Sequence, residues 1–92
     1  MAKTKAPAGL GPAGRKLWQA ITGEFELAEH ELAQLEEAAR TRDLLGRLRA
    51  ELDASPVMLE SSQGMRLHPA VAELRQQRLA LARLLATLGV PG

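Results

Sequence analysis

The chain has 92 residues, which is enough for one small domain with a limited core. Its apolar residues are mostly leucine and alanine, which favour helices, and only 2% of its residues are aromatic. It contains no cysteine, which excludes a disulfide framework, a thiolate zinc site and a cysteine nucleophile. The composition therefore predicts an all-α fold.

The charges are segregated along the chain, although the net charge is only +1. Residues 1–23 carry Lys3, Lys5, Arg15 and Lys16 without any acid, whereas residues 24–37 carry six glutamates without lysine or arginine. We expect residues 1–10 to form a flexible basic arm and residues 11–90 to form a single helical domain. This polarity fits either a basic arm for an anionic partner or a solvated tail beside an acidic helix.

The first helix is predicted to start at Pro12, because proline is tolerated in the first turn, and to stop at Gly23. Four residues fall at helical spacing on one face of it: Gly14, Leu17, Trp18 and Ile21. Gly14 adds no apolar area but allows another backbone to approach closely. The large apolar residues of this face, Leu17, Trp18 and Ile21, are the expected core anchors.

A second, longer helix is predicted to begin near Ala28 and to end before Pro56. Its apolar stripe consists of Leu32, Leu35, Ala39, Leu45, Leu48 and Leu52. Three pairs of opposite charge are spaced four residues apart: Glu36–Arg40, Asp43–Arg47 and Arg47–Glu51. Ala28 stands where a capping side chain would be expected ahead of Glu31, a loss of about 1 kcal/mol.

Residues 56–68 break the helical period and predict a short β-hairpin or an extended loop. A two-stranded ribbon is marginal alone, so Val57, Leu59 and Leu67 are candidates for contact with another subunit. The last helix is predicted from Pro69 to a stop at Gly89.

The two long helices are expected to lie antiparallel, with a turn centred near residue 60. This register pairs leucine with leucine or alanine at most levels, but it places Arg78 opposite Arg42. Two facing buried guanidinium groups would be costly. Three arrangements avoid that cost: both side chains extend outward to solvent, both accept a carboxylate from a neighbouring subunit, or both bind a phosphate.

Candidate catalytic residues are few. His30 lies within the acidic stretch, where a surface position is expected, and His68 precedes Pro69, where a role at the start of the helix is expected. The two histidines lack the spacing of metal ligands, and the serines of "SSQG" suit a turn. We therefore predict no enzyme activity, no metal and no cofactor.

Taken in order, four segments resemble the short, mainly helical family of phage terminase small subunits. The segments are "GLGPAGRKLWQAI", "EFELAEHELAQLEEAARTRDLL", "SSQGMRLHP" and "LRQQRLALARLLATLGV". They include an apolar–Trp first helix, an Ala–Ala–x–x–x–Asp run, a Ser–x–x–Gly turn and a Leu–Gly–apolar ending. The likeness covers roughly residues 9 to 90.

The resemblance implies the non-catalytic, DNA-recognition subunit of a motor that packages double-stranded viral DNA in the host bacterial cytoplasm. The implied partners are double-stranded DNA, the large terminase subunit and further copies of the chain in a ring. Lys3, Lys5, Arg15 and Lys16 are the expected phosphate contacts. Arg42 and Arg78 are, with the ribbon residues, the expected oligomer interface.

A rival interpretation is a helical adaptor that binds only protein through its leucine seam. A DNA-binding regulator is disfavoured, because no helix-turn-helix with a recognition helix can be placed. No apolar run reaches the roughly 20 residues that span a bilayer, and "MAKTKAPAGLG" lacks the apolar stretch of a secretory signal. We therefore expect a soluble intracellular protein with no membrane partner.

Overall fold

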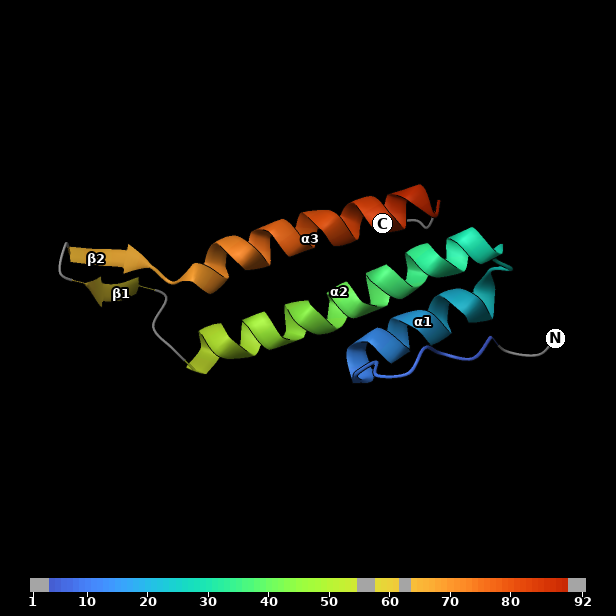
Figure 1. Ribbon diagram of the computed structural model, residues 1–92, viewed down its shortest axis with the longest axis horizontal. Coiled ribbons are helices and arrows are strands. Elements are labelled where there is room, and N and C mark those ends of the chain that lie inside the picture. Colours follow the sequence, from blue (N-terminus) through green and yellow to red (C-terminus); the bar gives the residue numbers. More distant parts are fainter. Residues whose placement is uncertain (1–3, 55–57, 62–63, 90–92) are drawn as a thin grey trace.

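The computed structural model describes residues 4–54, 58–61 and 64–89, with side chains over 4–54 and 68–89. Its elements are α1 (Pro12–Glu24), α2 (Glu29–Ala54), β1 (Met58–Ser61), β2 (Gly64–Leu67) and α3 (Pro69–Thr87). The predicted all-α class is confirmed, with a two-stranded ribbon as the addition to it. Figure 1 shows the elongated molecule, which measures 58 × 22 × 18 Å.

The long helix α2 lies in the middle and packs against both α1 and α3 (Figure 1). The chain reverses at the ribbon, so α3 runs antiparallel to α2. His68 Nε2 lies 3.7 Å from Glu51 Oε1, a pair that spans the gap between the two helices. These two residues are partners in a register centred near residue 60, so the predicted alignment of the helices is correct.

The core lies where α1 crosses the first half of α2. Its buried residues come from both helices and from the segment before α1: Leu10, Trp18, Ile21, Leu35 and Ala39. Leu35 and Ala39 have no exposed surface, and Trp18 is only 4% exposed. The predicted anchors Trp18 and Ile21 are buried, and Leu17 packs against the cluster while partly exposed.

The helix ends follow the local chemistry of the sequence with one exception. Ala28 precedes α2, and its backbone N–H donates to Glu31 Oε1 at 2.9 Å, so half of a capping box is present. Gly89 follows α3 with a φ of 76°, as expected for a glycine stop. The predicted stop at Gly23 is wrong, because α1 continues to Glu24 and ends on the extended residue Phe25.

The predicted hairpin forms between β1 and β2, which pair antiparallel with Leu59 opposite Arg66 and Met58 opposite Leu67. Val57 lies outside the described residues. Leu59 and Leu67 are placed only by this backbone pairing, since their side chains lie outside the described part of the chain. Their role in an interface stays a prediction.

Candidate nucleic-acid and assembly surfaces

A carboxylate from α2 caps the first helix. Asp43 accepts hydrogen bonds from the backbone N–H groups of Gly11 and Gly14, each at 2.7 Å. Gly11, the residue before α1, makes no side-chain cap of its own. The first N–H groups of a helix have no partner within it and carry partial positive charge. Asp43 therefore satisfies two of them and fixes the start of α1 on the middle of α2.

The same contact explains the glycine at position 14. Gly14 is buried, and a Cβ atom there would collide with the backbone carbonyl oxygen of Ala39 and with the Asp43 carboxylate. Ala39 is itself fully buried. The Ala–x–x–x–Asp spacing places the small residue and the cap one turn apart on α2, facing α1. These residues form what we call the interlock: Gly11, Gly14, Ala39 and Asp43.

The interlock changes two of the predicted charge pairs. Glu36 and Arg40 form the expected ion pair at 2.8 Å. Asp43 instead binds the α1 amides, and Glu51 faces His68 across the helix gap. The predicted Asp43–Arg47 and Arg47–Glu51 pairs are therefore wrong. Asp43 and Glu51 contact other parts of the fold instead, and the spacing of charges within one helix does not reveal such contacts.

The segment before α1 is packed against the helices. Trp18 Nε1 donates to the carbonyl oxygen of Thr4 at 3.1 Å, and Arg40 Nη2 donates to that of Ala8 at 3.3 Å. Gly9 has a φ of 85°, which allows the turn that carries Leu10 into the core, where it is 6% exposed. Residues 4–10 thus lie along the scaffold, which differs from the free arm that the composition predicted.

The predicted phosphate contacts lie on the first turns of α1 and on the segment that precedes it. Lys5, Arg15 and Lys16 are exposed, whereas Lys3 lies outside the described residues. Lys16 and Arg42 line one shallow cavity of about 480 Å³ between α1 and α2. A cation predicted for DNA binding and one predicted for assembly are therefore neighbours on one face.

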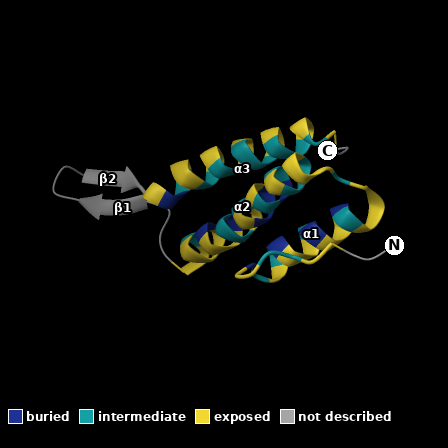
Figure 2. Ribbon diagram, turned by 45° about the vertical axis from the view of Figure 1, so that its right-hand side comes forward, coloured by how far each residue is buried: buried dark blue, intermediate teal, exposed yellow. Residues whose placement is uncertain are grey.

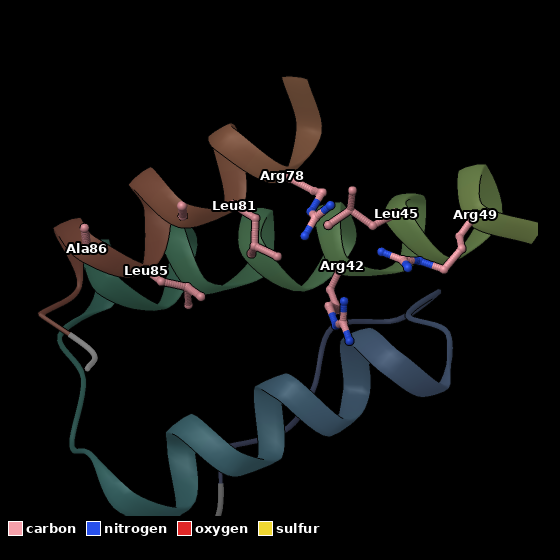
Figure 3. Close-up of a pocket in the computed structure, with 8 residues that line it drawn as sticks. Arg42, Leu45, Arg49, Arg78, Leu81, Leu85 and Ala86 are labelled. Carbon is pink, nitrogen blue, oxygen red and sulfur yellow. The ribbon is translucent and has the colours of Figure 1, made fainter. Parts of the chain in front are cut away.

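Arg42 and Arg78 lie at the same level, as predicted, but they do not form a buried pair. Both are exposed, in agreement with outward extension. Figure 3 shows Arg78 reaching from α3 across to α2, while Arg42 extends from α2 toward α1. Both line a groove of about 420 Å³ between α2 and α3, which also contains Arg49. No carboxylate among the described side chains pairs with these three arginines.

The two histidines differ in burial and in their contacts. His30 is exposed, and His68 caps α3 by accepting a hydrogen bond at Nδ1 from the Ala70 N–H at 3.0 Å. The predicted role of His68 at the helix start is confirmed. Within the described ranges, no group of three acidic or histidine side chains could hold a metal. No helix there has the length and apolarity to cross a membrane.

Comparison with protein families, curated proteins and solved structures found no match for this chain.

Four contributors to these surfaces differ from what the sequence predicts. The composition places Leu10 in the arm, although it is the large apolar residue in an otherwise small and polar stretch next to the first helix. Spacing favours a charge ladder for Asp43, and the predicted α2 stripe lacks Ala38, which is fully buried. Arg49 follows Arg42 by one heptad, so helical spacing could have predicted that both lie on the same side of α2 and line the same groove.

Proposed function

We propose that this protein is the small, DNA-recognition subunit of a double-stranded DNA phage packaging terminase. One observation supports this above the others: residues that carry the sequence resemblance meet in the interlock. The "GPAG" of the first helix and the Ala–Ala–x–x–x–Asp run of the second are distant in sequence, yet they contact each other through Asp43. The motif order is thus linked to one tertiary arrangement, which favours a shared fold over chance similarity.

The exposed cations supply the nucleic-acid contact in this proposal. Lys5, Arg15 and Lys16 sit on a rigid support, because Trp18 and Asp43 hold α1 to α2 and Trp18 also bonds the chain at Thr4. Cations of this kind bind backbone phosphates without reading base sequence. A few contacts per subunit are weak, but a ring multiplies them through effective concentration. Lys3 precedes the described residues and is included as a fourth contact.

The test is DNA binding titrated against salt. Replacing Lys5, Arg15 and Lys16 with alanine is expected to weaken binding and to reduce the salt slope by about one for each phosphate that is no longer neutralised. A matched variant replaces the exposed Arg47, Arg75 and Arg83 with alanine and keeps the same net charge. An equal loss of affinity in both variants would leave only a non-specific effect of charge and would refute this DNA surface.

The groove between α2 and α3 favours a second candidate, a helical adaptor that binds only protein. Its apolar floor and arginine rim suit an acidic amphipathic segment. Mass measurement under native conditions separates the two candidates. A closed ring of many copies that binds duplex DNA supports the terminase subunit, whereas a monomer or dimer without DNA binding supports the adaptor.

A further inference from the structure

The groove between α2 and α3 combines two features that rarely stay exposed together. Its floor is formed by Leu45, Leu81 and Leu85, and its rim carries Arg42, Arg49 and Arg78. Figure 3 shows Leu81, Leu85 and Arg78 coming from α3 and Leu45, Arg42 and Arg49 from α2, with Arg42 extending toward α1. Leu81 and Leu85 are only half-buried. An occupant must therefore present an apolar side chain to the floor and negative charge to the rim.

The chain itself offers such a segment in the connection between α1 and α2. Phe25 is one of two large apolar side chains that are exposed among the described residues, at 39%. It stands between Glu24 and Glu26, which are both exposed and form no ion pair with any described cation. This connection, Glu24–Phe25–Glu26, presents an aromatic anchor with a carboxylate on each side.

The other exposed large apolar residue does not fit the groove. Leu79 is 55% exposed on α3 and lines a second hollow with Arg75 and Arg78. Docking that face into the groove would bring arginines against Arg42 and Arg49. Like charges at a contact are unfavourable, whereas the glutamates beside Phe25 complement the rim. Charge therefore selects the α1–α2 connection over the α3 face.

We propose that Phe25 of one copy enters the α2–α3 groove of a second copy, where Glu24 and Glu26 pair with the arginine rim. This inference rests on the self-association contained in the proposed function and assigns its contact. Donor and acceptor are different surfaces, so copies can add head-to-tail and close into a ring if the rotation between copies allows. If two copies made the contact reciprocally, the product would be a two-fold dimer, whose native mass differs from that of a ring.

The test exchanges charge between the two surfaces. A donor variant (Glu24→Lys, Glu26→Lys) and an acceptor variant (Arg42→Glu, Arg78→Glu) are each expected to remain monomeric in native mass spectrometry and sedimentation velocity. Mixed one to one, they should assemble again, because each donor then meets a groove of opposite charge. A control variant, Arg47→Glu with Arg83→Glu, reverses two exposed charges outside the groove and should assemble like the wild type.

Circular dichroism shows whether each variant is folded. If a charge variant is not, Phe25→Ala replaces one exposed side chain and is expected to weaken assembly at least tenfold. Cross-linking provides a further measurement, since the chain has no cysteine of its own. In a mixture of Glu26→Cys and Arg78→Cys chains, oxidation should enrich the mixed dimer over either dimer of identical chains.

The outcomes separate this contact from the proposed function. If the acceptor variant and Phe25→Ala both assemble as the wild type does, the proposed contact is overturned. The DNA-recognition proposal would still stand. A wild-type chain that stays monomeric at all concentrations would overturn the contact and the ring together. DNA binding and its salt slope would still be judged separately through Lys5, Arg15 and Lys16.

Discussion

The two sides of α2 differ in how completely they are packed. On the α1 side, Leu35 and Ala39 have no exposed surface, and Asp43 satisfies two helix-terminal amides. On the α3 side Leu45 of α2 is buried, but the leucines of α3 are half-buried or exposed, and Ala70 alone is buried among the residues of α3 (Figure 2). The α1–α2 half is packed more completely, whereas the α2–α3 half leaves apolar surface partly exposed. Stability should therefore reside in the first half and assembly in the second.

Truncating one leucine on each side of α2 is expected to give the largest difference in stability. Leu35→Ala removes a fully buried side chain from the α1 side and is expected to cost about 3 to 5 kcal/mol of unfolding free energy. Leu81→Ala on the half-buried side should cost about 1 kcal/mol in dilute protein, with a larger effect on assembly. Urea unfolding at several protein concentrations measures both. Equal losses in dilute protein would contradict the comparison.

Glycine substitutions test the close approach of α1 to α2. Gly14→Ala is expected to destabilise the protein by about 3 kcal/mol, because the new methyl group meets a backbone carbonyl that cannot turn away. The matched control is Gly46→Ala, also within a helix, where a Cβ atom has no neighbour within 4 Å. The control should stabilise by up to about 1 kcal/mol, since alanine favours helix. Thermal unfolding followed by circular dichroism measures the change in stability of each variant. Changes of the same sign in the two variants would contradict the close approach at Gly14.

Removing the cap probes the polar half of the interlock. Asp43→Ala leaves the Gly11 and Gly14 amides without their carboxylate and is expected to cost about 2 kcal/mol. Asp53→Ala removes the same charge from an exposed position on α2 and should stay within about 0.5 kcal/mol. Amide hydrogen exchange at Gly14 should accelerate in the first variant only. Equal exchange in both would show that water replaces the cap without loss.

The smallest predicted effect is a gain at the start of α2. Ala28→Ser adds the missing capping side chain at the residue whose backbone N–H already donates a hydrogen bond to Glu31. The completed box should stabilise the protein by about 1 kcal/mol. Chemical denaturation measures the gain, with Ala33→Ser at an exposed position inside the helix as the control. A gain no larger than that of the control would mean that the cap position is already satisfied.

The sequence predicted the helices, their antiparallel register and the burial of Trp18 and Ile21, because helical periodicity and proline or glycine boundaries are local signals. It did not predict that Asp43 caps α1, because that bond joins residues 29 and 32 positions apart. A local ladder with Arg47 was an equally good explanation of the same aspartate. Where local and tertiary partners compete, spacing alone cannot select between them.

The surfaces were predicted less completely than the fold. Placing Arg42 and Arg78 at one level required only the helix register, and the structure agrees. Whether those guanidinium groups faced inward or outward depended on the separation of α2 and α3, which periodicity does not contain. The packing of residues 4–10 was likewise hidden, since it depends on Trp18 reaching a backbone carbonyl.

Hydrogen exchange of the wild-type chain across a wide range of protein concentrations tests the difference between the two sides of α2 most directly. We predict that amides of α1 and the first half of α2 are protected equally at every concentration, while those of α3 gain protection as copies associate. Protection of α3 that is already complete in the most dilute sample, and unchanged on concentration, would contradict the account.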